Sequence, residues 1–503
     1  MLSRRHLLLG GGLAAAGLAR AGAAQPLPDA PYTGPFGTVP ELQPLRGWLE
    51  GQDRLAEGLR VQGRIPAGLR GTLYRNGPGL FERGGQRYAH WFDGDGLLQA
   101  WRFGPQGVSH QARFVRTRKF ELEQDAGEFL LPAFGTALRA KRPLRASDDV
   151  NTANTSVMLQ GGKLYALWEG GSAYELDPDS LHTLGPKAWA PELKGMPFSA
   201  HPKRELQGPH AGTLWNFGTF MGKLALYQIG ADGQLQRSAV LDLPGAPMVH
   251  DFAVTEHFIV FLLPPLALDR EALKAGRSFV GAMRWQEGGA NRVVVIDKAD
   301  LSIKAQLEMP AELLFHIGNA WDDGQGVIRL DYVHTDHQRF LSGEFNRMLQ
   351  GQASPELAAS HPRLLQIDLI RRRVDIERRS EQVEFPQVDP RVVARRNRYV
   401  YYPEARAATW GHGALLSLDL ARGLTERFDF GPGVMVEEQL LVPKPGTRRE
   451  GQGWLVGTGF DSRRQKTFCT IFDAEAISAG PLATVWLPYW APLGFHGHFA
   501  QTA

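Results

Sequence analysis

Residues 161–177 read Gly-Gly-Lys-Leu-Tyr-Ala-Leu-Trp-Glu-Gly-Gly-Ser-Ala-Tyr-Glu-Leu-Asp. Two short runs rich in apolar residues stand beside glycine pairs, and the second run ends in an aspartate. Apolar runs of this length, bounded by turn residues, are typical of β-strands. The ending, an apolar run followed by Asp and a turn, recurs at Val295-Ile-Asp297, Leu365-Gln-Ile-Asp368, Leu416-Ser-Leu-Asp419 and Ile471-Phe-Asp473.

This recurrence fits one outer hairpin per blade of a β-propeller. Helix-like stretches are few, and they are Asp269–Gly276, Gly343–Gln350 and part of Gln124–Arg145. A length of 503 residues alone would allow about three domains, but propellers often run this long as one unit. We therefore predict an all-β chain with one propeller domain over residues 25–503, capped on one face by loops and a few helices.

The charge of the chain argues against a polyanionic partner. The formal net charge is +3, and the first 24 residues carry Arg4, Arg5 and Arg20 with no acidic residue. The remaining chain therefore has equal numbers of basic and acidic residues, which predicts no nucleic-acid partner. The single cysteine, Cys469, excludes an intrachain disulfide, a cysteine zinc cluster and an iron–sulfur site.

The first 24 residues have the features of an export signal. Paired arginines precede an apolar segment that runs to Ala19, and the small residues Ala21-Gly-Ala-Ala24 follow. This order is typical of a secretory signal, and the arginine pair resembles a twin-arginine signal. The alternative is an uncleaved membrane anchor, although the apolar run is shorter than the roughly 20 residues that a span needs. We predict a signal peptide over residues 1–24 and a periplasmic or exported protein.

Four of the 15 histidines stand in contexts suited to a buried ligand. They are His201, His250, His316 and His496, which lie 49, 66 and 180 residues apart. In a propeller this separation places each on a different blade, and four neutral imidazoles would suit iron, copper, nickel or zinc. Any one of them alone is more typical of a hydrogen-bonded core residue. His498 rivals His496, because residues two apart on a strand share one face.

Local motifs add a family resemblance that runs from about Ile65 to the C-terminus. The segments are Ile65-Pro-Ala-Gly-Leu-Arg-Gly-Thr-Leu-Tyr-Arg-Asn-Gly-Pro-Gly79, His90-Trp-Phe-Asp-Gly-Asp-Gly96, Asn151-Thr-Ala-Asn-Thr155 and Leu164-Tyr-Ala-Leu-Trp-Glu-Gly-Gly171. With the contexts of the four histidines, they resemble the carotenoid cleavage oxygenase family. The resemblance implies a seven-bladed β-propeller with one Fe(2+) ion per chain on its axis, held by His201, His250, His316 and His496.

The same resemblance implies that Glu169, Glu384 and Glu438 accept hydrogen bonds from three of the four imidazoles. It also implies oxidative cleavage of a conjugated C=C bond of an apolar polyene, with O2 as co-substrate and no organic cofactor. The sequence departs from the family pattern at Gln439 and at Glu450-Gly-Gln-Gly453, which affects loop shape more than the metal site.

Several alternatives stay open at this point. The segment around Asn154 and Trp168 favours a carotenoid or apocarotenoid substrate, but the family also contains a stilbene cleaver. A protein that binds an apolar pigment without catalysis is a further alternative. The apolar stretch Phe261–Leu268 is a candidate for peripheral membrane contact, and a core strand followed by a buried loop is the other interpretation. No protein partner is evident.

Overall fold

The computed structural model describes residues 29–39, 43, 46, 48–243, 245–335, 347, 349–352, 359–405 and 412–502. The predicted export signal, residues 1–24, and most of the predicted helix at Gly343–Gln350 lie outside these ranges. None of the helices in the described ranges is long and apolar enough to cross a membrane.

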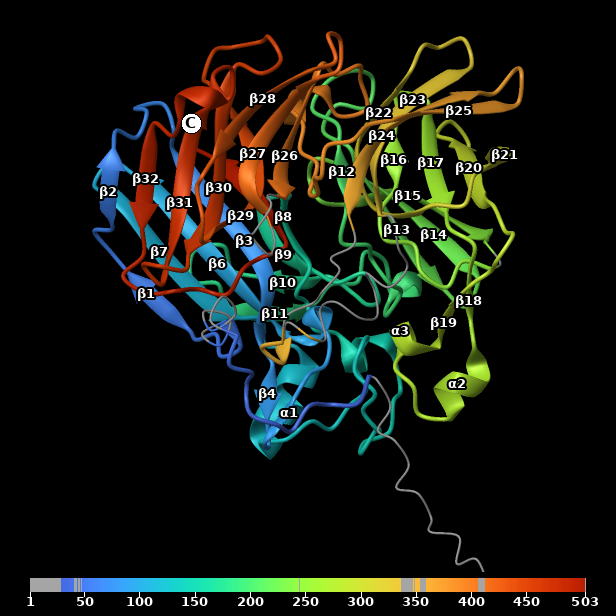
Figure 1. Ribbon diagram of the computed structural model, residues 1–503. Helices are drawn as coiled ribbons and strands as arrows, with labels where there is room; N and C mark the ends of the chain where they lie inside the picture. The colour runs from blue at the N-terminus through green and yellow to red at the C-terminus, as the bar shows by residue number, and fades with distance from the viewer. Residues whose placement is uncertain are drawn as a thin grey trace, which may run out of the picture.

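Seven antiparallel sheets form the blades of a β-propeller, which confirms the predicted fold class (Figure 1). Each blade is given from its inner to its outer strand. The first has β33 (His496–Gln501), β3 (Gly71–Leu80), β6 (Asp95–Gly104), β7 (Gly107–Phe114) and β1 (Arg54–Ala56). The second has β8 (Ser156–Gln160), β9 (Lys163–Leu167), β10 (Tyr174–Leu176) and β11 (Thr183–Pro186). The third has β12 (Lys203–Arg204), β13 (Leu214–Phe220), β14 (Lys223–Ile229) and β15 (Leu235–Asp242).

The remaining four blades follow in chain order. The fourth has β16 (Ala253–Val254), β17 (Phe258–Leu263), β20 (Asn291–Asp297) and β21 (Ile303–Met309). The fifth has β22 (Leu313–Asp322), β23 (Val327–Thr335), β24 (Ser360–Asp368) and β25 (Arg373–Arg378). The sixth has β26 (Tyr399–Ala405), β27 (His412–Asp419) and β28 (Leu424–Asp429). The seventh has β29 (Val434–Pro443), β30 (Gly453–Asp461), β31 (Lys466–Asp473), β32 (Ala483–Trp486) and β2 (Arg60–Gly63).

Both faces of each blade are buried, which explains the continuous apolar runs. In β20, Val294 and Ile296 pack in the core shared with the third blade, whereas Val293 and Val295 pack toward the fifth. Successive side chains of a strand point to opposite faces, so a strand between two neighbours needs apolar residues at every position.

The aspartates that follow the strands stabilise the turns. Asp297, Asp368, Asp419 and Asp473 each accept a hydrogen bond from the backbone N–H two residues further on. Asp177 likewise accepts from the N–H of Ser180. A short carboxylate bonded to its own turn is a common device for reversing the chain. The repeated Asp therefore marks the outer hairpins, as the sequence indicated.

The cap lies on one side of the blades, at the bottom of Figure 1. It contains the helices α1 (Arg118–Ala126), α2 (Arg270–Lys274) and α3 (Phe279–Ala282) and the hairpins β4 (Glu82–Arg83)–β5 (Gln86–Arg87) and β18 (Leu266–Leu268)–β19 (Met283–Trp285). Helix α2 lies inside the predicted segment, whereas α1 begins before the segment Gln124–Arg145. Single-turn 3-10 helices stand at Trp91–Asp93, Ser147–Val150, Pro191–Leu193, Pro390–Val392 and Ile477–Ala479.

The stretch Phe261–Leu268 begins as a core strand. Phe261, Leu263 and Leu266 are at most 6% exposed and pack in the core. Leu266–Leu268 form the hairpin strand β18 and not the buried loop of the alternative interpretation. The end of the stretch, Ala267 and Leu268, lines a cavity. Peripheral membrane contact near this stretch stays a prediction.

Ring closure joins the two ends of the chain twice. β3 from the N-terminal part pairs with the C-terminal β33, and β2 pairs with β32 of the last blade. Gly71 opens β3 with φ +133°, and a Cβ at this position would lie 2.1 Å from the carbonyl oxygen of Ala500 in β33. Only glycine has ready access to this backbone conformation, so Gly71 is required where the ring closes.

We expect Gly71→Ala to lower the free energy of unfolding by about 2–4 kcal/mol, because it adds backbone strain and a clash across the closure. Gly107→Ala is the matched control, since Gly107 has φ +119° but no atom within 4 Å of a built Cβ. It should cost only about 1 kcal/mol. Urea unfolding followed by tryptophan fluorescence measures both. Equal losses would show that the closure adds nothing at this position.

Candidate metal centre

Four blades each bring one of the predicted histidines to the axis. His201 and His250 stand just before the inner strands β12 and β16, His316 lies in β22, and His496 opens β33. One ring nitrogen from each lies within 4.8 Å of the others. The Nε2 atom of His250 is 3.0 Å from that of His201 and 3.3 Å from that of His316. His498 is not a member of this group.

Two irregular strands help to aim the side chains. In β22 the register shifts between Leu314 and Ile317, so that the segment with His316 bulges from the ladder. In β29 the same shift occurs between Val436 and Gln439, which places both Glu437 and Glu438 in the interior. A bulge redirects side chains that regular alternation would turn away.

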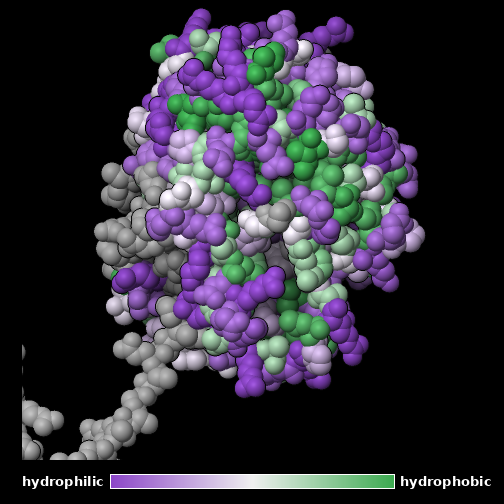
Figure 2. Space-filling model, turned by 90° about the vertical axis from the view of Figure 1, so that its right-hand side faces the viewer, coloured by the Kyte–Doolittle hydropathy of each residue, from purple (hydrophilic) through white to green (hydrophobic). Residues whose placement is uncertain are grey.

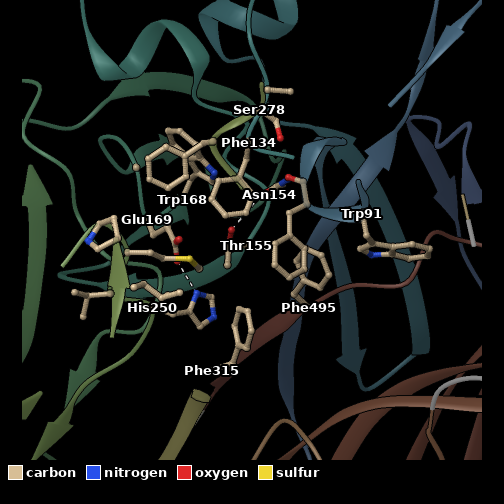
Figure 3. Close-up of a pocket in the computed structure, with 18 of the residues that line it drawn as sticks. Trp91, Phe134, Asn154, Thr155, Trp168, Glu169, His250, Ser278, Phe315 and Phe495 are labelled. Carbon is tan, nitrogen blue, oxygen red and sulfur yellow. Dashed lines mark hydrogen bonds and ion pairs between the residues drawn. The ribbon is translucent and has the colours of Figure 1, made fainter. Parts of the chain in front are cut away.

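The three predicted glutamates lie against three of the histidines. Glu169 contacts Nδ1 of His250 at 2.5 Å, and Figure 3 shows this pair at the edge of the cavity. Glu384 lies 2.5 Å from Nδ1 of His316, and Glu438 lies 2.9 Å from Nδ1 of His496.

These contacts fix the tautomer of each ring. With the proton on Nδ1, the Nε2 lone pair points to the common centre. In the described ranges, His201 has no carboxylate within ion-pair distance. The second, sixth and seventh blades thus supply carboxylates, while the other four supply histidines.

Burial sets the protonation of the group. Burial and the three neighbouring rings hold the pKa of His201 well below its ordinary value. Burial also lowers the pKa of His496 to about 4, and Glu438 offsets only part of this shift. For His316, burial lowers the pKa, but Glu384 together with Asp251 and Glu438 outweighs burial and the net pKa is raised.

The donor set fits a metal ion. The Nε2 atoms of His250 and His316, whose Nδ1 atoms face carboxylates, lie 3.3 Å apart, and a cation between them would accept both lone pairs. Imidazole donors suit divalent iron, copper, nickel and zinc, and carboxylates bonded to Nδ1 are the usual support of such ligands. His201, His250, His316 and His496 would hold the ion.

The comparisons with known proteins agree with this geometry. A family model described as "Retinal pigment epithelial membrane protein" (RPE65) matches residues 49–501, nearly the whole chain. The chain belongs to the RPE65/carotenoid cleavage oxygenase family. This confirms the resemblance inferred from the sequence motifs.

The relatives are oxygenases. Apocarotenoid-15,15'-oxygenase of Synechocystis sp. is 32% identical, over 88% of this chain and 92% of that protein. Lignostilbene-alpha,beta-dioxygenase isozyme III of Sphingomonas paucimobilis is 28% identical, over 92% of this chain and 96% of that protein. The crystal structure of cobalt-substituted Synechocystis ACO matches with a TM-score of 0.83 and 31% identity, over 92% of this chain and 99% of that chain.

A large cavity reaches the four-histidine cluster from the cap side. Its volume is about 1740 Å³, and His250, His316 and His496 stand in its wall. Its aromatic lining residues are phenylalanines and tryptophans: Trp91, Phe92, Phe134, Trp168, Phe220, Phe279, Phe315, Phe385 and Phe495. Figure 3 shows several of these rings around the cavity.

Buried carboxylates anchor the cap wall of this cavity. Glu123 accepts hydrogen bonds from the backbone N–H groups of Leu130 and Leu131, both at 3.0 Å. Asp93 accepts from the N–H of Gly135 and the hydroxyl of Thr136. Burial raises the pKa of Asp93 to about 6, against the effect of these hydrogen bonds. The wall therefore rests on side chains of the cap and the first blade.

Sequence reasoning missed the residues that hold Glu438. Arg75, which is fully buried in β3, donates to Glu438 at 2.7 Å, and Gln387 donates to the other carboxylate oxygen at 2.7 Å. The N–H of Gly497 adds a third bond at 2.8 Å. Burial raises the pKa of Glu438, but His496 and Arg75 outweigh it and keep the pKa below its ordinary value. A signal existed for Arg75, a charged residue inside an otherwise apolar and glycine-rich strand.

We expect Glu384→Gln to lower the affinity for a divalent metal about 10- to 100-fold, because the amide holds His316 less firmly. Competition against a chelator, with metal content read by mass spectrometry, measures the change. Glu377→Gln is the control, since this side chain is 64% exposed on β25. Unchanged affinity in Glu384→Gln would contradict the supporting role.

Proposed function

We propose that this protein is an Fe(II)-dependent dioxygenase that cleaves a conjugated C=C bond of an apocarotenoid into two carbonyl products. The observation that best supports this proposal is that the histidine cluster borders the large cavity. Four imidazoles converge at one point, and this point borders a largely apolar cavity of about 1740 Å³. The membership of the oxygenase family adds the reaction class.

The overall reaction is balanced without a further reductant. The C=C bond and O2 are consumed, and each carbon of the double bond receives one oxygen atom. When bound, Fe(II) supplies the redox chemistry that O2 activation requires. The four histidines hold the ion, and Glu169, Glu384 and Glu438 keep each bonded ring in one tautomer and orientation.

Aromatic side chains of the cavity wall would position the substrate beside the histidines. Phe315 and Phe385 stand next to the histidine rings, with centroids 5.0 Å from His250 and 5.1 Å from His316 respectively. Aromatic rings there would pack against a flat conjugated substrate and keep bulk water from its reacting bond.

The size and lining of the cavity favour a long polyene over a hydroxystilbene. A stilbene is compact, and its phenol needs a polar partner inside the site. The wall does offer polar groups, such as Asn154, Thr155 and Gln382, so the preference for a long polyene rests on the size and the aromatic lining of the cavity. The stilbene-cleaving relative keeps stilbene cleavage as the second candidate.

Iron-loaded protein mixed with an apocarotenal should bleach the polyene absorbance and release two carbonyl products. With labelled O2, mass spectrometry should find one labelled oxygen in each product, because both atoms of O2 enter the products. His316→Ala should lose both iron and cleavage. Cleavage of a hydroxystilbene without bleaching would replace the proposed substrate, and protein without stoichiometric iron would support the pigment-binding alternative.

We further propose that the protein is exported folded, with its metal in place, through the arginine pair of residues 1–24. Arg4→Lys combined with Arg5→Lys should leave the protein in the cytoplasm of a host with twin-arginine export, because that pathway reads the pair. Cell fractionation and immunoblotting measure this, with Arg20→Lys as the control. Equal export of the double variant would contradict the proposal.

A further inference from the structure

The charged residues that line the large cavity are segregated by sign. Its carboxylates, Glu169, Glu384 and Glu437, stand at the histidine end, where each already contacts a neighbouring histidine or hydroxyl. Its cations are Arg139, Arg270, Lys274 and Arg277, all from the cap. Helix α2, which carries two of them, lies at the outer edge of the molecule in Figure 1.

The two cap segments that carry these cations pack against each other. The N–H of Val280 donates to the carbonyl oxygen of Phe134 at 3.0 Å. Asp29 accepts from the backbone and hydroxyl of Ser278, at 2.8 Å and 2.6 Å. The N–H of Ala137 donates to the carbonyl oxygen of Asp29 at 2.7 Å. Residues 134–140 and the α2–α3 segment therefore border the same part of the cavity.

Two of the four cations are already paired. The Nζ atom of Lys274 lies 2.7 Å from a carboxylate oxygen of Glu271, and the Nε atom of Arg277 lies 3.0 Å from a carboxylate oxygen of Asp29. Across the described residues, Arg139 and Arg270 have no carboxylate within 4.0 Å. Both side chains are exposed and both line the cavity. This outer end of the cavity thus carries an uncompensated positive charge.

We propose that Arg139 and Arg270 bind an anionic end group, a carboxylate, of the polyene that occupies the cavity. The inference rests on the proposed function and narrows its substrate to a polyene acid. Guanidinium groups bind carboxylates in a planar, two-point geometry, and the apolar side chains Leu138 and Leu273 beside them suit the hydrocarbon chain. Holding the acid end outside fixes how far the chain reaches toward the histidines.

The rim also exposes apolar side chains, Phe220 at 48% and Met221 at 84%. Figure 2 shows the face that carries α2, with a hollow bordered by hydrophobic and hydrophilic side chains. A rim of this kind alone would also suit an anionic lipid surface. The carboxylate is favoured because the two arginines line the cavity itself.

The experiment measures binding, so it does not depend on cleavage. Metal-loaded protein is titrated under nitrogen with an apocarotenoic acid and with its methyl ester, both in neutral detergent. Quenching of tryptophan fluorescence reports binding, since Trp91 and Trp168 line the cavity. The acid should bind about tenfold more tightly than the ester, and added salt should reduce this ratio.

Arg139→Ala combined with Arg270→Ala should bring the ratio close to one and leave ester binding unchanged. Arg142→Ala is the matched control, because Arg142 is exposed in the same segment but does not line the cavity. Equal affinities of acid and ester in the unmodified protein would overturn the proposal. So would a double variant that keeps the ratio and instead loses binding to anionic vesicles. Failure to cleave any polyene would overturn the proposed function and leave this result intact.

Discussion

The structure depends on one electrostatic constraint at the axis of the propeller. Three carboxylates lie against three of the four imidazoles: Glu384 and Glu438 are buried, and Glu169 is 19% exposed. Burial lowers the pKa of His201 and His496. Buried negative charge without compensation is very costly. Arg75 balances one carboxylate, and a dipositive ion among the imidazoles would balance the other two. Such an ion would then stabilise the interior of the fold as well as supply chemistry.

This constraint couples ring closure to the metal centre. The first sheet contains strands from both ends of the chain, and its register sets Arg75 opposite Gly497 and Asn76 opposite His496. Arg75 then reaches across to Glu438 of the last blade, which in turn holds His496. The pairing of β3 with β33 that closes the propeller therefore also positions His496. If the ring opened, both the packing between the first and last blades and the position of His496 would be lost.

The fold could be predicted from the sequence more completely than the geometry of the candidate site. Turn aspartates such as Asp368 and Asp419 are local signals, because each accepts a hydrogen bond from its own turn. They predict the outer hairpins without knowledge of any distant contact. The positions of His316 and Glu438 relative to the axis depend on bulges, which have no local signature here. Arg75 stands out as a charged residue inside β3, but its partner Glu438 is 363 residues away, so the sequence pattern could not identify what Arg75 holds.

The blades and the cap contribute different parts of the cavity. The inner strands of the blades hold or closely follow the four histidines, and three carboxylates orient three of the rings. The cap is built from short helices and loops anchored by buried side chains such as Asp93 and Glu123, and it leaves Arg139 and Arg270 unmatched toward solvent. Because ladder geometry does not constrain the cap, we expect substitutions there to change ligand binding in the cavity more than the arrangement of the four histidines.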